Sequence, residues 1–408
     1  MFPTTTLVAM LTLLPIAAQD QHHPHDATVY DIPESGRPAR IPFQFVENEV
    51  RIEATVNGAG PFHIIVDTGM PIPGVLLFRN ERVDALHLEG NGQHVRVAGA
   101  GGSGTTSEAL MASGVSVATG ELKMSKASAL VIAKPDGFPP GVDGVIGAAL
   151  FNHYAVRIDM DASRIELHDS AKWSPPDGAC VIPLERDAGR VFVDVRTAVG
   201  SEEPVQARVV VDIGAGHALS LNTRDDGRFA PPANAIEAPL GRGVSGVVLG
   251  KLGRSRRVEI GSFSFDNVVT SFPVKTHQKP GGADFRDGNL GEEILKRFNL
   301  TFDYAGKRLM LEKAKSFGEP FEHEMAGMSL DWDKDGFVVV GNVLPQSPAA
   351  GASIEPGDRL ISIDGRSVES LGENGLRKAF TVEGAELRLA LKRGDQTIEK
   401  KLRLRRLV

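Results

Sequence analysis

Residues 62–69 read FHIIVDTG, and this stretch decides how the rest of the chain is interpreted. The apolar, β-branched run predicts a buried strand. Asp67 ends that strand, and Gly69 allows a tight turn just beyond it. A carboxylate at the tip of a buried strand is unfavourable unless something uses it. Because strand-end acids often only cap turns, the interpretation depends on whether a second such acid exists.

A second stretch of this kind ends at Asp212. Residues 207–215 read ARVVVDIGA, so Asp212 also closes an apolar run, and Gly214 follows two positions later. The offset between the two acids is 212 − 67 = 145 residues. A repeat at this distance indicates two copies of one structural unit.

A closer internal match lies downstream of each acid. Residues 144–167 and 288–311 align without a gap, at an offset of 288 − 144 = 144. Each segment opens with a glycine, and two residues later an apolar residue precedes a second glycine, which is Gly147 in the first copy and Gly291 in the second. Each then predicts a short helix and a β-hairpin.

Each copy also carries a glycine-rich loop between its acid and this segment. The first loop contains Gly101 and Gly102, and the second contains Gly243 and Gly246. One such loop is usually a flexible surface turn, but two at matching positions indicate hairpin tips that lie close to something. We therefore expect a mainly β fold with two duplicated lobes packed about a pseudo-twofold axis, which would bring the two acids face to face.

Length and composition agree with this organisation. A chain of 408 residues exceeds one ordinary core, and 45 glycines with 25 prolines favour a β-rich protein with many turns. A formal net charge of −7 gives no reason to expect a nucleic-acid partner. The only cysteine, Cys180, excludes an internal disulfide. Metal-binding spacings such as His-Glu-x-x-His are absent, so we expect no metal and no cofactor.

The first residues predict export. Residues 7–18 are apolar and end in Ala-Ala before polar Gln19, as in a secretory signal peptide. The alternative is a single membrane anchor, for which this stretch is short. We expect a cleaved signal, a periplasmic or extracellular location of bacterial type, and no integral membrane segment afterwards. The expected organisation is a signal peptide (1–18), a flexible N-terminal tail (19–40), lobe 1 (41–168), a linker (169–181), lobe 2 (182–312) and a C-terminal domain (325–408).

The repeated order of an acid loop and an apolar-glycine segment resembles the aspartic peptidases, and in particular two fused retropepsin-like units. The resemblance covers about 270 of the 408 residues. It implies an exported aspartic endopeptidase that acts on a polypeptide substrate as a monomer, with Asp67 and Asp212 as the catalytic pair. It also implies that Thr68, Gly69, Gly214, Gly147 and Gly291 support the acid loops, and that the two glycine-rich loops are flaps over the substrate.

Two carboxyl groups within hydrogen-bond reach explain why this chemistry needs two acids. They cannot both ionise, so they share one proton. The charged acid takes a proton from a bound water, which attacks the peptide carbonyl, and the protonated acid donates to the developing oxyanion or the leaving group.

The second copy departs from the family pattern. The family has Thr or Ser after the acid, where the hydroxyl binds the main chain of the opposite lobe; Thr68 can do this and Ile213 cannot. The next position often carries a hydroxyl for the carboxylate, but here it is Met70 or Ala215. The hypothesis is an active enzyme that is less adapted to acid. The alternatives are a degenerate, catalytically inactive peptide-binding protein and a single-acid site completed by a homodimer.

The C-terminal region closely resembles a bacterial PDZ domain, a small α+β sandwich. The resemblance rests on SPAA at 347–350 and on PGDRLISIDG at 356–365. It implies that the loop Gly327, Met328, Ser329 and Leu330 holds the terminal carboxylate of a peptide, beside a helix over 371–380. The domain either recruits or gates substrate through such a C-terminal peptide, or braces the lobes without binding one.

Overall fold

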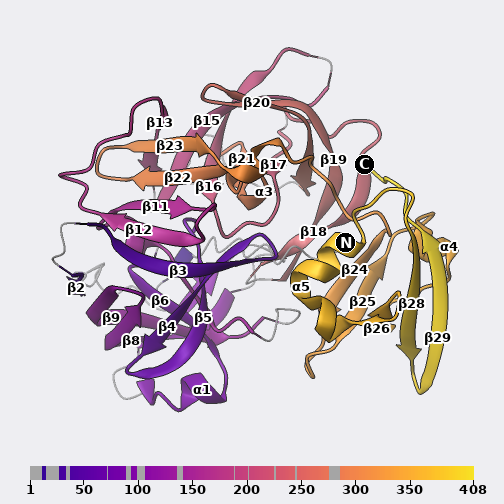
Figure 1. Cartoon of the computed structure of the whole chain (residues 1–408), viewed down its shortest axis with the longest axis horizontal. Coiled ribbons are helices and arrows are strands. Elements are labelled where there is room, and N and C mark those ends of the chain that lie inside the picture. Colours follow the sequence, from indigo (N-terminus) through magenta and orange to yellow (C-terminus); the bar gives the residue numbers. More distant parts are fainter. Residues whose placement is uncertain are drawn as a thin grey trace.

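The computed structural model describes residues 12–14, 27–33, 37–70, 72–88, 93–98, 106–135, 141–187, 189–200, 202–224, 227–243, 246–274 and 285–408. It confirms the expected fold class: a mainly β chain with two lobes and a C-terminal PDZ domain (Figure 1). Most of the expected signal peptide lies outside the described residues, apart from the short strand β1 (Thr12–Leu14), which pairs with β7.

Within the described residues, lobe 1 consists mainly of β-strands, with two short α-helices. Its elements are β2 (Val29–Asp31), β3 (Ala39–Val46), β4 (Glu49–Val56), β5 (Ala59–Val66), β6 (Gly74–Arg79), α1 (Glu81–Asp84), β7 (Gln93–Ala98), β8 (Thr106–Thr119), β9 (Leu122–Ala133), β10 (Gly144–Ile146), α2 (Ala148–Phe151), β11 (Ala155–Asp159) and β12 (Arg164–His168).

Lobe 2 repeats this order. Its elements are β13 (Cys180–Pro183), β14 (Glu185–Asp187), β15 (Arg190–Ala198), β16 (Val205–Asp212), β17 (Leu219–Leu221), β18 (Ile236–Gly243), β19 (Gly246–Ile260), β20 (Phe263–Pro273), β21 (Gly288–Gly291), α3 (Glu292–Leu295), β22 (Phe298–Asp303) and β23 (Arg308–Lys313). Strand β13 starts at Cys180 and so takes up the last residues of the expected linker 169–181.

The same strand crossing positions the acid in each lobe. In lobe 1, β10 inserts parallel to β5 and antiparallel to β6; in lobe 2, β21 inserts parallel to β16 and antiparallel to β17. The acid-bearing strand is therefore paired on both sides along its last residues, by β4 and β10 in lobe 1 and by β15 and β21 in lobe 2. Such a strand is buried on both faces, as its continuous apolar sequence predicts.

The two lobes join through one antiparallel pair of equivalent strands. Strand β11 pairs with β22 so that Val156 lies opposite Phe302, Arg157 opposite Thr301 and Ile158 opposite Leu300. With the repeat offset of 144, Val156 corresponds to Leu300 and Ile158 to Phe302, so exchanging the lobes leaves this register unchanged. The pseudo-twofold axis therefore passes between Arg157 and Thr301. The outer hairpin partners continue the sheet across the boundary, in the order β12, β11, β22, β23 (Figure 1).

The PDZ domain is a small sheet with one main helix. A short 3₁₀ helix leads into it (Lys315–Gly318), and its elements are β24 (Met328–Trp332), β25 (Val338–Val343), α4 (Pro348–Gly351), β26 (Arg359–Ile363), β27 (Arg366–Ser367), α5 (Val368–Ala379), β28 (Glu386–Arg393) and β29 (Gln396–Arg403). Ser347 caps α4 by accepting a hydrogen bond from the Ala350 N–H at 3.2 Å. Helix α5 begins three residues before the expected 371–380, because Ser367 caps it by accepting from the Ser370 N–H.

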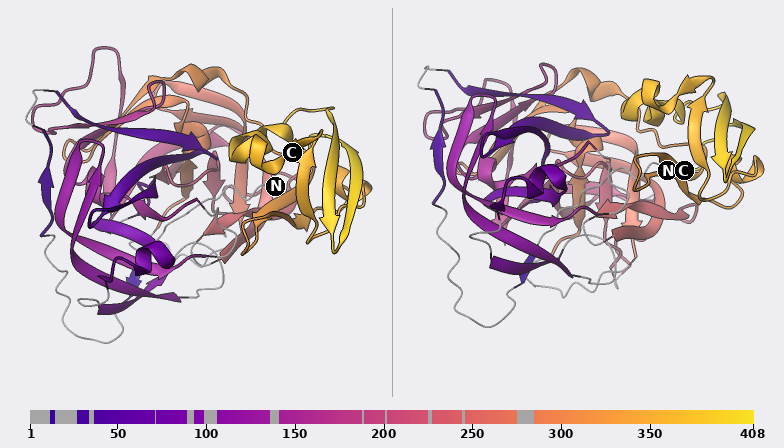
Figure 2. Two further views of the ribbon diagram at one scale, coloured as in Figure 1. Left: turned by 60° about the horizontal axis from the view of Figure 1, so that its bottom comes forward. Right: turned by 90° about the horizontal axis from the view of Figure 1, so that it is seen from below.

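The PDZ domain lies beside both lobes (Figure 2). Leu344 of this domain packs with Ala238, Leu240 and Leu252 of lobe 2 in one apolar cluster. Helix α5 faces lobe 1, where the Asn374 side chain donates to the Phe45 carbonyl oxygen at 3.1 Å and accepts from the Glu47 N–H at 2.9 Å. The domain is therefore packed against the rest of the chain on two sides.

Candidate active site

The two acids extend from equivalent strand ends and are both fully buried. Asp67 follows β5 and Asp212 ends β16, and each side chain has 0% exposed surface. Each carboxylate accepts a hydrogen bond from the glycine two residues on: Gly69 N–H to Asp67 Oδ1 at 2.6 Å, and Gly214 N–H to Asp212 Oδ1 at 3.1 Å. The sequence-predicted pair is thus held by its own turns.

The acids face one another across the lobe boundary, and each packs on the turn of the other. A Cβ added to Gly214 would lie 2.7 Å from both Asp67 carboxyl oxygens, and one added to Gly69 would lie 3.1 Å from Asp212 Oδ1. Each carboxyl group therefore lies against the turn that carries the other, close enough for the charge of Asp212 to act on Asp67. Only glycine leaves room for this contact, which explains both glycines of the predicted support set.

Burial and proximity change the acidity of the pair. Burial raises the pKa of Asp67 well above its usual value, and the nearby charge of Asp212 raises it further. Burial also raises the pKa of Asp212, while the hydrogen bond from the Gly214 N–H opposes the shift. Two buried acids this close resist a second negative charge, and this favours one shared proton in the pair.

Thr68 ties the two lobes together, as the resemblance implied. Its Oγ1 donates to the carbonyl oxygen of Val211 at 2.7 Å and accepts from the N–H of Ile213 at 3.1 Å. All three atoms lie beside the acids and away from solvent, so one hydroxyl fixes the spacing of the two acid loops.

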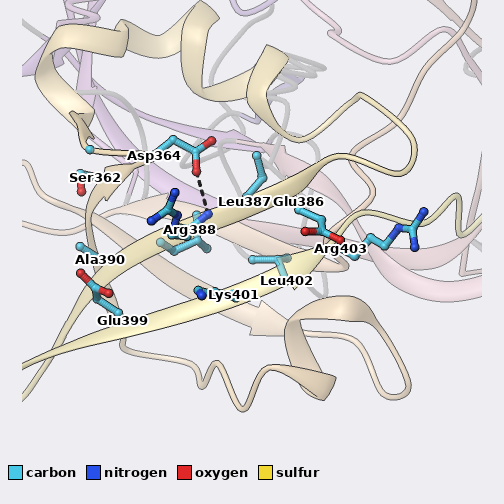
Figure 3. A pocket seen from close by; sticks show the side chains of 12 residues that line it. Ser362, Asp364, Glu386, Leu387, Arg388, Ala390, Glu399, Lys401, Leu402 and Arg403 are labelled. Carbon is cyan, nitrogen blue, oxygen red and sulfur yellow. Dashed lines mark hydrogen bonds between the residues drawn. The ribbon is translucent and has the colours of Figure 1, made fainter.

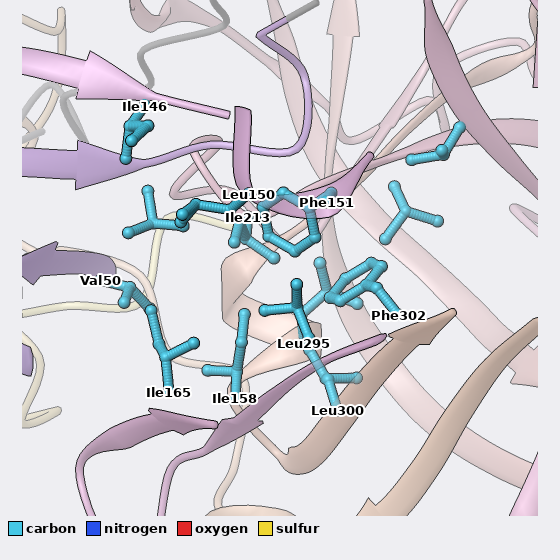
Figure 4. Packing of buried hydrophobic residues seen from close by; sticks show 14 of the residues in the cluster. Val50, Ile146, Leu150, Phe151, Ile158, Ile165, Ile213, Leu295, Leu300 and Phe302 are labelled. Atoms are coloured by element: carbon cyan, nitrogen blue, oxygen red, sulfur yellow. The ribbon is translucent and has the colours of Figure 1, made fainter. Parts of the chain in front are cut away.

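Ile213 cannot return these bonds, and it contributes packing instead. Its side chain has no exposed surface and lies in the main apolar cluster with Leu150 and Phe151 of lobe 1 (Figure 4). The departure from the family pattern is therefore filled by buried apolar contact across the lobe boundary.

Gly147 and Gly291 lie directly beneath the acid loops. A Cβ on Gly147 would approach the Met70 carbonyl oxygen to 2.5 Å, and one on Gly291 would approach the Ala215 carbonyl oxygen to the same distance. The next N–H in each lobe, from Ala148 and Glu292, donates to these same carbonyl oxygens. Both glycines therefore leave room for the acid loop that lies above them.

Two polar residues near Asp212 were not predicted from the sequence. The Asn289 amide donates to Asp212 Oδ2 at 3.0 Å, and Glu292 is a fully buried acid whose two oxygens have no hydrogen-bond partner among the described residues. Burial raises the pKa of Glu292 well above its usual value. A signal was present for Asn289, because it interrupts an apolar segment that reads Val145-Ile146 in the other copy.

The predicted flap glycines divide between described and undescribed residues. Gly101 and Gly102 lie outside the described residues. Gly243 and Gly246 pair with each other at the end of the long hairpin formed by β18 and β19. Hairpin strands of this kind are consistent with the predicted flap of lobe 2.

The predicted peptide-binding loop of the PDZ domain is largely buried. Met328, Ser329 and Leu330 have little exposed surface, and the N–H of Gly327 already donates to the Glu324 carboxylate at 2.9 Å. A separate hollow of about 1050 Å³ lies on the outer sheet face, where Asp364 accepts from the Arg388 N–H (Figure 3). Its side chains carry charges of both signs, so it selects no simple class of ligand.

Among the described residues, no group of three or more His, Cys, Asp or Glu side chains could hold a metal ion. Within the same ranges, no helix has the length and apolar character needed to cross a membrane.

Two family models match separate parts of the chain. A family model described as aspartyl protease matches residues 52–150, and a PDZ domain model matches residues 317–392. No curated protein matches the sequence. Among solved structures, the crystal structure of basic 7S globulin from soybean is similar at 12% identity and a TM-score of 0.41, over 71% of this chain and 97% of the globulin chain. The chain therefore contains an aspartyl protease domain and a C-terminal PDZ domain.

Proposed function

We propose, from a chain that contains an aspartyl protease domain and a C-terminal PDZ domain, that the protein is an exported aspartic endopeptidase. The observation that supports this most strongly is the meeting of Asp67 and Asp212, two fully buried acids from two repeated lobes, each of which packs on the turn of the other. An isolated buried pair of acids would be unfavourable without a shared proton, and a shared proton is what peptide hydrolysis by this class needs.

The reaction then uses the pair as base and acid. The ionised carboxylate takes a proton from a water molecule as the water oxygen bonds to the peptide carbonyl carbon, and the protonated carboxyl gives its proton to the carbonyl oxygen. The resulting tetrahedral diol collapses when the carbon–nitrogen bond breaks and the nitrogen receives a proton from the pair. The flap of lobe 2 covers an extended polypeptide, and the PDZ domain recruits substrate or gates its access.

The raised pKa values set the expected pH range. Activity requires one proton in the pair, so it falls when pH drops below the lower apparent pKa and both acids are protonated. Because burial raises the pKa of both acids, the acid limb of the rate profile lies at higher pH than for ordinary carboxyl groups. A catalytic rate that peaks well below pH 4 contradicts this hypothesis.

The test is cleavage of a mixed peptide library by the wild type, by Asp67→Ala and by Asp212→Ala, between pH 3 and pH 8. Both variants should lose at least about a thousandfold in kcat, because each removes one half of the acid–base pair. Asp395→Ala, at an exposed turn of the PDZ domain, is the matched control and should keep wild-type activity. Inhibition by a pepstatin-type transition-state analogue should accompany cleavage.

A second candidate function is that of a peptide-binding adaptor with the same fold and no catalysis. The observation in its favour is Ile213, which replaces the second hydroxyl of the lobe contact. It predicts no cleavage by the wild type at any pH in the same assay, together with retained binding of the analogue. Sequencing the N-terminus of the mature protein tests export, since cleavage after residue 18 is expected.

A further inference from the structure

Asn289 makes the two acids chemically different. It lies on β21, next to the acid-bearing strand β16, and only 4% of its surface is exposed. Its Nδ2 donates to Asp212 Oδ2 at 3.0 Å, so Asp212 accepts from both Asn289 and the Gly214 N–H. Among the described residues, Asp67 accepts from the Gly69 N–H alone, and its Oδ2 has no hydrogen-bond partner.

Lobe 1 has no counterpart of this bond, although the lobes are repeats. The equivalent position is Val145, which is fully buried in an apolar cluster with Met70. In lobe 2 the residue matching Met70 is Ala215. Lobe 2 therefore differs from lobe 1 at both positions: Ala215 is smaller than Met70, and Asn289 carries an amide where lobe 1 has the apolar Val145.

We propose that Asn289 is a positioning residue that fixes Asp212 as the ionised acid of the resting pair and leaves the shared proton on Asp67. A hydrogen-bond donor stabilises a carboxylate more than a neutral carboxyl group, because the bond to a charged acceptor is stronger. Asp212 has two donors outside the pair and Asp67 has one. The Asn289 amide supplies Asp212 with the hydrogen bond that a hydroxyl residue after Gly214 would donate in the family pattern.

The charged groups around the pair favour the same assignment. Arg190 and Arg286 both favour the charged form of Asp212. Glu292 is the remaining acid that faces Asp212, and burial raises its pKa well above the usual value. The groups that act on the pair from neighbouring elements are Glu49 and the Tyr304 hydroxyl on the Asp67 side, and Arg190, Arg286 and Glu292 on the Asp212 side.

The inference assigns roles within the proposed reaction and rests on that function. Asp212 takes the proton from water, and Asp67 gives its proton to the carbonyl oxygen. After the diol forms, Asp67 is ionised and Asp212 is protonated. Asp212 then returns its proton to the leaving nitrogen, and Asp67 takes a proton from the diol, which restores the resting pair.

The first experiment follows the carboxyl carbons by ¹³C NMR during a pH titration of the full chain without substrate. Asn289→Val copies the lobe 1 residue and should raise the lower apparent pKa of the pair by about one to two units, the shift expected for one lost bond to a charged acceptor. Adding Ala215→Ser to this variant places a hydroxyl on the acid loop and should restore at least half of the shift. An unchanged titration in Asn289→Val overturns the proposal, as does a shift that Ala215→Ser leaves untouched.

The second experiment needs no change at Asn289 and covers the outcome in which that variant does not fold. Asp67→Asn leaves Asp212 as the lone acid, and Asp212→Asn leaves Asp67, each beside a neutral amide. The lone Asp212 should titrate at least one unit below the lone Asp67, because it keeps the larger number of donors. Equal values, or the reverse order, overturn the proposal.

These readouts separate the inference from the proposed function. If the wild type cleaves no peptide but the titrations behave as expected, the enzyme proposal fails and the assignment of Asn289 stands. If the wild type cleaves peptides but the titrations do not depend on Asn289, only the inference fails. In an active enzyme, the acid limb of kcat/KM should move with the NMR value, while KM for an uncharged substrate stays within about twofold.

Discussion

At the scale of single residues, the two lobes are not symmetric. Only one lobe has a hydroxyl directly after its acid, and only one has an amide that supports its acid. Thr68 bonds across the boundary and Ile213 packs there; Asn289 supports Asp212 and Val145 supports no acid. The sequence predicted Asp67, Asp212 and the reach of Thr68, because those residues stand in recognisable positions of a repeated motif. It did not predict the role of Asn289, because a hydrogen bond from a neighbouring strand depends on how the two strands pair.

Thr68→Val tests the bridging hydroxyl. The variant keeps the side-chain volume but leaves the Val211 carbonyl and the Ile213 N–H without a partner in a buried site. We expect the free energy of unfolding at pH 7 to fall by about 2–4 kcal/mol, measured by urea denaturation. The matched control is Thr119→Val, which loses a single buried bond to the Glu53 carbonyl and should cost about 1 kcal/mol. Equal losses in the two variants contradict the bridging role.

At the scale of elements, the internal repeat predicted more than any single propensity. The two short helices and the two hairpins after Gly147 and Gly291 form where the aligned segments placed them. The PDZ resemblance implied a helix from residue 371, whereas α5 begins three residues earlier at the Ser367 cap and is interrupted at Gly372, whose backbone is not helical. Turn and cap chemistry sets element ends, and the apolar pattern alone does not show it.

Gly214→Ala tests the turn at the end of β16. The added Cβ would lie 2.7 Å from both carboxyl oxygens of Asp67, so the acids must move apart. We expect kcat to fall at least about a hundredfold while the protein still folds, because a shift of about 1 Å in the reacting groups can cost that much. Gly141→Ala, where the new Cβ meets nothing within 4 Å, should leave kcat unchanged. Wild-type kcat in Gly214→Ala would show that the acids need not be in contact.

At the scale of the whole molecule, a charged contact holds the PDZ domain on lobe 1. Arg51 donates to the Glu373 carboxylate at 2.8 Å and 3.1 Å, and Arg377 donates to Glu293 of lobe 2 at 2.8 Å. Burial raises the pKa of Glu47 to about 7 and that of Glu49 to about 8, which limits repulsion among the acids there near neutral pH. The sequence could not predict the contact with lobe 1, because its partners lie more than 300 residues apart and share no motif.

Glu373→Lys tests whether these contacts hold the domain in place. The variant sets a lysine against Arg51, which is itself largely buried, so the interface loses an ion pair and gains repulsion. We expect α5 to leave lobe 1, seen as a larger radius of gyration by small-angle X-ray scattering and as faster cleavage by trypsin near residues 313–325. The control is Glu369→Lys at an exposed site on the same helix. An unchanged scattering profile in Glu373→Lys would show that the apolar contact with lobe 2 is sufficient.

The sheet that crosses the lobe boundary also changes what the linker between the lobes is for. Because β11 and β22 pair directly and Thr68 bonds across the same boundary, the recognition between the halves lies in the sheet and the acid loops. The covalent connection through residues 169–179 then acts as a tether that raises the effective concentration of one half around the other. The protein then resembles a dimer whose two subunits are joined in one chain. Because the two halves are separate stretches of sequence, each can change independently, and they differ at Asn289 and Ile213.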